Sequence, residues 1–295
     1  ILSSRGLQTP GSMGPERALA AITGAAAEVL DEAHTAVAAV CIGCGGPMDR
    51  EAGVLHDVPN LPGWQGLCLT RIFSERFGVP AFLDNDATAA AIGEAAFGAG
   101  RGVQHFVYFT ISTGIGGGII IDGRPYRGAG DNAGEFGHMK VIANGGPSCP
   151  CGDSGCLESI ASATSIARAA RERLEQGETS IISEWTSSPA HVTAEMVSRA
   201  AEQGDPLASR VWAGAVEALG IGVSNVVQCL NPQLVVLGGG VTRAGDLLFE
   251  PVRRMVRDRS MAPLAADVEV VPAENGDLVG LMGAAALAFL EMSKG

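Results

Sequence analysis

The sequence is short of basic residues. Its 20 lysines and arginines stand against 32 aspartates and glutamates, which gives a formal net charge of −12 over 295 residues. A protein that binds duplex DNA needs a concentrated basic face, and this composition does not provide one. The charge balance therefore argues against nucleic acid as a partner.

Long hydrophobic runs are also missing. No stretch of about 18 or more apolar residues is free of charges, which is the length that a membrane-spanning helix needs. The first residues, ILSSRGLQTPG, lack the charged-then-apolar layout of a secretory signal. Hydrophobic residues still make up 46% of the chain, enough for a substantial core in one large domain or two ordinary ones. We expect a cytoplasmic globular protein without membrane contact.

Cysteine is sparse outside one cluster. Three of the seven cysteines, Cys149, Cys151 and Cys156, lie within the segment SCPCGDSGC. An odd total with one tight cluster fits a metal site better than a disulfide framework. Together with His138 the cluster supplies one imidazole and three thiolates, the usual set for a closed, structural zinc site. The remaining cysteines stand in or beside apolar stretches and are expected to be small buried hydrophobic residues: Cys41, Cys44, Cys68 and Cys229.

Hydrophobic periodicity predicts an α/β protein. Helices are expected at residues 15–33, 66–77, 87–97, 158–174, 206–229, 244–258 and 280–292, and strands at 36–43, 79–84, 106–112, 117–123, 233–240 and 268–273. Residues 113–116 read as the turn of a hairpin. We expect two lobes, an N-terminal one of residues 1–86 with 281–295 and a C-terminal one of residues 87–280 that carries the zinc site.

Two glycine-rich segments are candidates for ligand contact. In STGIGGG (112–118) the unobstructed backbone N–H groups could cradle phosphate oxygens, with the Thr113 hydroxyl beside them, or the segment is simply a tight turn. The strand of NPQLVVLGGGV ends in Gly238, Gly239 and Gly240, which permit close approach of a bulky ligand or form a packing turn.

The segment LDNDA (83–87) closes a strand and opens a helix. Open α/β sheets place ligands at the carboxyl ends of their strands, and a carboxylate there can accept a proton from a substrate hydroxyl. The alternative is that Asp84 or Asn85 only caps the helix.

The segment EFGH holds a second polar pair. Glu135 and His138 are three residues apart and would share one face of a helical turn. Glu158 follows the last clustered cysteine by two residues, so a metal site would hold it rigidly.

Together these segments resemble the ROK family of sugar kinases and transcriptional repressors. The resemblance covers about residues 36–292 and rests on LDNDATAAAIGEAAFGAG, TISTGIGGGIIIDG, AGEFGH, CPCGDSGCLE, NPQLVVLGGGV and GLMGAAALA, which stand in the family's order. It implies the actin-like ATPase (sugar kinase/Hsp70) fold, with two α/β lobes around a ligand cleft.

The resemblance also implies roles for individual residues. Asp86 would be the base that takes the proton from the 6-hydroxyl of the sugar. His138 would serve twice, with one ring nitrogen on zinc and the other toward the sugar. The implied sugar ligands are Gly46, Asn60, Asn85, Asp86, Glu135, His138 and Glu158. The implied ATP contacts are Thr113, Gly114, Gly116, Gly238, Gly239 and Gly240.

The function that follows is transfer of phosphate from magnesium-bound ATP to a hexose, with glucose as the first expectation. The alternatives are an N-acetylmannosamine or N-acetylglucosamine kinase, or a sugar-binding repressor or truncated remnant without catalysis. A homodimer or homotetramer is also implied.

Family members open with a hairpin bearing Asp-x-Gly-Gly-Thr, which this sequence does not show. We expect the complete protein to be a kinase and the chain as given to lack that ATP-binding hairpin. Asp84 is a further departure, because Asn or Glu is frequent there among the family's glucokinases.

Overall fold

The strands form three sheets within the part of the chain described by a computed structural model, residues 1–8, 13–56, 58 and 61–293. The largest sheet has the order β7-β6-β5-β8-β9. β5 pairs antiparallel with β6 and parallel with β8, so β5 is where the sheet changes direction. Its strands are β5 (Phe106–Ile111), β6 (Ile115–Ile121), β7 (Arg124–Tyr126), β8 (Leu234–Gly238) and β9 (Glu269–Pro272).

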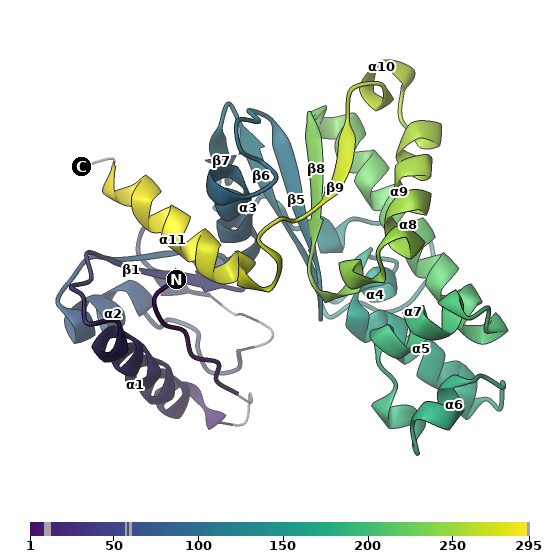
Figure 1. The fold of residues 1–295 in the computed structure, drawn as a ribbon, viewed down its shortest axis with the longest axis horizontal. Helices are drawn as coiled ribbons and strands as arrows, with labels where there is room; N and C mark the ends of the chain where they lie inside the picture. The colour runs from purple at the N-terminus through teal and green to yellow at the C-terminus, as the bar shows by residue number, and fades with distance from the viewer. Residues whose placement is uncertain (9–12, 57, 59–60, 294–295) are drawn as a thin grey trace.

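Helices cover both faces of this sheet (Figure 1). One face packs against α3 (Asp86–Phe97), whose alanines 90 and 91 join Phe106 and Tyr108 in a hydrophobic cluster. The opposite face carries the largest cluster of the core, which runs from Phe109 to the long helix α8. The helices on that side are α4 (Glu158–Ala161), α5 (Ala163–Glu175), α6 (Ile182–Trp185), α7 (Ala194–Glu202), α8 (Pro206–Leu230), α9 (Asp246–Arg259) and α10 (Ala262–Ala265).

Helix α8 is the one described helix that is long and apolar enough to cross a membrane by length and composition. It begins after Asp205, whose side chain accepts a hydrogen bond from the Ala208 N–H at 2.8 Å, and it ends at Asn231 in the left-handed conformation. In this fold 56% of its most apolar stretch is buried against the sheet and the neighbouring helices. Its apolar character is therefore explained by its place in the core.

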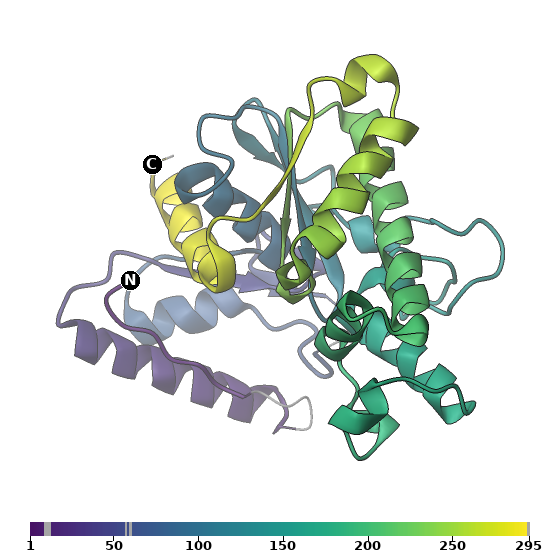
Figure 2. The ribbon, with the colours of Figure 1, turned by 45° about the vertical axis from the view of Figure 1, so that its right-hand side comes forward.

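The remaining elements form a separate group around a small parallel sheet (Figures 1 and 2). β1 (Val40–Cys44) pairs with β4 (Ala81–Asn85), and the register places Cys44 opposite Asn85. The core of this group includes Met48, Leu55 and Leu83. The other elements are α1 (Pro15–Ala33), β2 (Met48–Asp49), β3 (Val54–Leu55), α2 (Leu69–Phe77) and α11 (Val279–Met292). We propose that the two lobes divide at the β4–α3 junction, with residues 281–295 returning to the first lobe.

The predicted elements are present with shifted ends. The hairpin turn is shorter than expected, because β6 already begins at Ile115, opposite Ile111. The helix expected at 158–174 is interrupted at Ser162, whose hydroxyl accepts a hydrogen bond from the Ser165 N–H and so caps a new helix. The strand expected at 36–43 begins four residues later and ends one residue later, at Val40–Cys44. The prediction that Cys229 is buried is wrong: it lies exposed near the end of α8, while Cys41, Cys44 and Cys68 are half-buried.

Candidate functional site

The junction between β4 and α3 carries the polar residues of LDNDA. Asn85 is the helix cap, since its Oδ1 accepts hydrogen bonds from the N–H groups of Ala87 at 2.9 Å and Thr88 at 3.1 Å. Asn85 therefore caps the helix, and the neighbouring exposed residue Asp86 accepts the Ala87 N–H through its Oδ1 at 2.8 Å. Protein atoms still surround Asp86 on most sides, and this desolvation raises the pKa of its carboxyl. Asp86 thus combines access to solvent with a strengthened affinity for protons.

The end of β1 approaches this junction closely. A Cβ on Gly43 would lie 3.6 Å from the Asp86 Cα, so this strand passes the start of α3 in van der Waals contact. The following loop contains Gly46, where a Cβ would lie 3.7 Å from the Asn85 Nδ2 atom. The structure therefore places the predicted sugar ligand Gly46 beside Asn85. Asn60, another predicted sugar ligand, lies outside the described residues.

Glu135 and His138 come together as predicted. Glu135 precedes the short 3₁₀ turn Phe136–His138, and its Oε2 lies 3.9 Å from the His138 Nε2. The pKa of Glu135 is raised, mainly because burial desolvates its carboxylate, and the negative charges of Asp86 and Glu158 add to the rise while His138 opposes it. The charges of Asp86, Glu158 and His138 therefore all act on the carboxyl of Glu135.

Glu158 connects the start of α4 to the β5–β6 turn. Its Oε2 accepts a hydrogen bond from the Ile115 N–H at 2.7 Å. A Cβ on Gly114 would lie 2.5 Å from this same oxygen, so a side chain at residue 114 would displace the carboxylate. Gly114 is thus required by the approach of Glu158, whether or not it also contacts phosphate.

The other residues of the glycine-rich hairpin have different surroundings. Thr113 is exposed at the tip of the turn, where its hydroxyl is available to a ligand. Gly116 lies inside β6, and a Cβ there would be 3.2 Å from the Ala87 side chain. Packing against α3 accounts for the absence of a side chain at Gly116, and its contact with ATP stays a prediction.

The glycines after β8 also differ in their surroundings. A Cβ on Gly238 would lie 2.4 Å from the Tyr108 hydroxyl oxygen, and one on Gly239, at φ +92°, would lie 2.5 Å from the Ile111 carbonyl oxygen. Both are explained by packing. Gly240 instead lines a cavity of about 430 Å³ together with Thr193, Arg199 and Arg243. Of the three glycines, Gly240 has the surroundings of a ligand contact.

The predicted metal ligands converge in space. One donor atom from each of His138, Cys149, Cys151 and Cys156 can be chosen so that all lie within 4.8 Å of one another. The sulfurs of Cys151 and Cys156 are 3.7 Å apart, and the Cys149 sulfur is 3.5 Å from the His138 Nδ1. Tetrahedral zinc with Zn–S bonds of about 2.3 Å separates two sulfurs by roughly 3.8 Å. The donor set and its spacing therefore fit zinc.

Two further features agree with a metal at this place. His138 turns Nδ1 toward the Cys149 sulfur and Nε2 toward Glu135, as a residue shared by two sites requires. Lys140 donates a hydrogen bond to the Cys156 sulfur at 3.2 Å, and its ammonium also pairs with Asp153 at 2.6 Å. Three thiolates around Zn²⁺ leave one net negative charge, which the Lys140 ammonium would balance.

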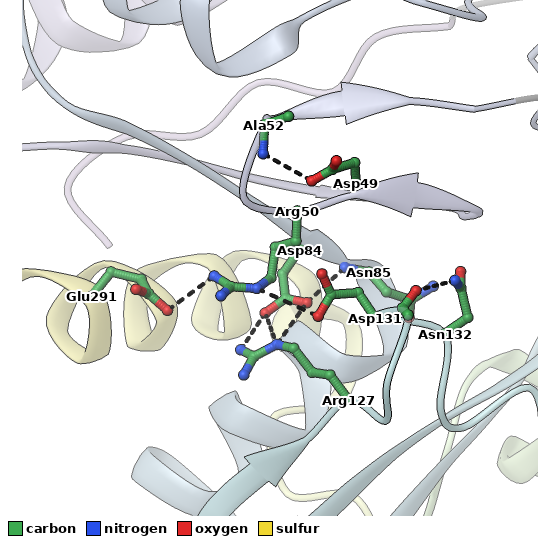
Figure 3. Close-up of polar contacts among 10 residues, drawn as sticks. Asp49, Arg50, Ala52, Asp84, Asn85, Arg127, Asp131, Asn132 and Glu291 are labelled. Atoms are coloured by element: carbon green, nitrogen blue, oxygen red, sulfur yellow. Dashed lines mark hydrogen bonds and ion pairs between the residues drawn. The ribbon is translucent and has the colours of Figure 1, made fainter.

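Sequence reasoning missed three ion pairs in the neighbourhood of Asn85. Arg127, after β7, donates from Nε to the buried carboxylate of Asp84 at 3.0 and 3.3 Å (Figure 3). Arg50, in the β2–β3 turn, lies 4.0 Å from Asp131 and 3.4 Å from Glu291 of α11. All three ion pairs join segments that are far apart in the sequence, so no local spacing pattern could reveal them.

Known proteins resemble this chain over most of its length. A family model described as "ROK family" matches residues 1–290. The glucokinase of Thermotoga maritima is 40% identical over 248 residues, which cover 84% of this chain and 78% of that protein. The xylose repressor of Caldicellulosiruptor bescii is 31% identical over 251 residues, covering 85% of this chain and 62% of the repressor.

A solved structure shows the same fold. The ROK family glucokinase of Streptomyces griseus, determined in complex with glucose and AMPPNP, has a TM-score of 0.82 and 32% identity, covering 95% of this chain and 88% of that one. The architecture is the two-lobed, actin-like ATPase fold of the sugar kinases. From the family model and from the identity to its members, the chain belongs to the ROK family.

Proposed function

We propose that the protein phosphorylates a hexose at its 6-hydroxyl with ATP, with glucose as the substrate. The observation that carries this proposal is the exposed carboxylate of Asp86 at the start of α3, next to the carboxylates of Glu135 and Glu158. The glucokinase relatives and the glucose-bound structure of a ROK glucokinase support the same activity.

The proposed chemistry needs one proton acceptor. The Asp86 carboxylate takes the proton of the sugar 6-hydroxyl as that oxygen bonds to the γ-phosphorus and the bond to the ADP oxygen breaks. The raised pKa of Asp86 strengthens its carboxylate as a proton acceptor. Asn85, Glu135, His138 and Glu158 would hold the sugar hydroxyls, because each presents a polar side chain near Asp86.

The ATP side of the site is proposed from separate observations. Thr113 and Gly114 form the exposed turn between β5 and β6, where a phosphate could contact a hydroxyl and backbone N–H groups. The cavity beside Gly240, with Arg199 and Arg243, would take the nucleoside end. Magnesium would neutralise phosphate charge during the transfer.

The metal cluster has a structural role in this proposal. All four zinc positions would be filled by protein atoms, which leaves none for water or substrate. Zinc would fix the ring of His138 and the segment that leads to Glu158.

We also propose that the protein is cytoplasmic and forms a homodimer or homotetramer. Light scattering would test the oligomeric state.

A coupled assay for ADP release tests the function. Glucose, N-acetylmannosamine, N-acetylglucosamine, fructose and mannose would each be supplied with ATP and magnesium, and glucose is expected to give the highest kcat/KM. Turnover of an N-acetylhexosamine alone would reassign the substrate. Glucose binding without turnover of any sugar would favour the alternative, a sugar-binding repressor or remnant without catalysis.

A further inference from the structure

The loop between β7 and Glu135 is held against the first lobe at two points. Arg127 at its start pairs with the buried Asp84, and Asp131 in its middle pairs with Arg50 (Figure 3). The Arg127 side chain is 12% exposed and that of Asp84 is 3% exposed, so the first contact is almost dry. These ion pairs bring the next residue, Asn132, to the side of Asn85.

The orientation of both amides is set by hydrogen bonds. Asn85 uses its Oδ1 to accept the N–H groups of α3, which leaves the Nδ2 donor facing outward. Asn132 uses its Nδ2 to donate to the carbonyl oxygen of Gly130, which leaves its Oδ1 as the free acceptor. One amide therefore offers a donor and the other an acceptor.

The two free atoms converge over Gly46. A Cβ on Gly46 would lie 3.7 Å from the Asn85 Nδ2 and 3.8 Å from the Asn132 Oδ1. A hydroxyl is the group that can accept one hydrogen bond and donate another at the same oxygen. The space above Gly46 is thus bordered by a hydrogen-bond donor, the Asn85 Nδ2, and an acceptor, the Asn132 Oδ1, and a sugar hydroxyl can bind both.

We propose that Asn132 is a specificity-determining residue, whose side-chain oxygen accepts a hydrogen bond from the same sugar hydroxyl to which Asn85 donates. This inference rests on the proposed function, because it takes a hexose to be the ligand. A sugar that lacks this hydroxyl would leave both amides unpaired, and a sugar with the epimeric hydroxyl would place it out of reach of one of them.

The test measures sugar affinity by calorimetry for the wild type and Asn132→Ala, using glucose and its 2-, 3- and 4-deoxy analogues. We expect Asn132→Ala to weaken glucose binding by about tenfold. For one analogue, the one lacking the contacted hydroxyl, the wild type and Asn132→Ala should bind equally, since the partner is already gone. Asn132→Asp keeps an acceptor oxygen but loses the amide that donates to the Gly130 carbonyl oxygen, so its glucose affinity should lie between those of the wild type and Asn132→Ala.

Two results for the Asn132→Ala variant would overturn the inference: an unchanged affinity for glucose, or the same loss of affinity for glucose and every analogue, as a general disturbance of the loop would give. Lack of sugar binding by the wild type would also overturn it. The ADP-release assay on the wild type is read separately. Sugar binding without turnover would contradict the kinase proposal while the affinity series still decides the role of Asn132.

Discussion

Gly93 of α3 and Gly283 of α11 bring the two helices into backbone contact. A Cβ on Gly93 would lie 2.8 Å from the Gly283 nitrogen, and a Cβ on Gly283 would lie 2.4 Å from the carbonyl oxygen of Ala89. Helix α3 begins with Asp86, and α11 also packs on β1 of the first lobe. This helix crossing therefore sets where the candidate base lies relative to the first lobe.

Replacing Gly283 by alanine should separate the helices. The backbone of α3 cannot yield as a flexible side chain would, so we expect a loss of about 1–3 kcal/mol in the free energy of unfolding. Gly280 in the same helix is the matched control, because no described atom lies within 4 Å of a Cβ there. Gly280→Ala should be neutral or stabilising through helix propensity. Denaturant unfolding that ranks the two variants the other way would contradict the contact.

Asp86→Asn should abolish turnover while leaving sugar affinity within a few-fold. Asparagine fills the same space but cannot accept the hydroxyl proton. Steady-state kinetics gives kcat, and calorimetry with glucose gives the affinity. A variant that keeps most of its kcat would remove Asp86 from the role of base.

The pH dependence follows from the raised pKa of Asp86. Because the reaction needs the ionised carboxylate, kcat should fall with decreasing pH at a higher pH than the ordinary aspartate value of 3.8 would give. The effect on stability is opposite. Because the pKa of Asp86 is higher in the folded than in the unfolded state, the free energy of unfolding falls as the pH rises from the unfolded pKa through the folded pKa. Asp86→Asn should therefore raise Tm at neutral pH, and the gain should shrink at acidic pH.

Cys151→Ser should remove the metal. Cys151 is exposed, so the substitution leaves packing almost unchanged and isolates the loss of a ligand. We expect metal analysis to give about one zinc per chain in the wild type and much less in the variant, with a lower Tm because zinc binding contributes to folding. The exposed Cys229 supplies the control, Cys229→Ser, which should keep its zinc. Full zinc content in Cys151→Ser would contradict the site.

Arg127→Met should destabilise the protein by about 3 kcal/mol or more, because it leaves the buried Asp84 carboxylate without its partner. Arg124, exposed three residues earlier on β7, provides the control Arg124→Met, whose effect should stay within about 0.5 kcal/mol. The KM for glucose should rise in Arg127→Met alone, since the loop that carries Asn132 is released. Equal unfolding free energies for the two variants would show that the ion pair adds nothing.

The short-range features of this protein could be predicted from its sequence. The zinc ligands lie within nineteen residues, and Glu135 and His138 within one helical turn, so their spacing in the chain already limits their spacing in the fold. The cap at Asn85 is also local, because a side chain can reach the N–H groups two and three residues ahead.

Only the tertiary structure decided what the glycines do and which distant residues complete the site. Packing of α3 on Gly116 and of Tyr108 against Gly238 explains why neither position carries a side chain, while their contacts with ATP stay predictions. Arg127 and Asn132 carried no recognisable motif. They lie more than forty residues beyond Asp84 and Asn85, and a contact over that separation depends on how the lobes fold together rather than on any repeat along the chain. Local spacing thus determined the chemistry of the individual segments, and long-range packing determined how those segments meet.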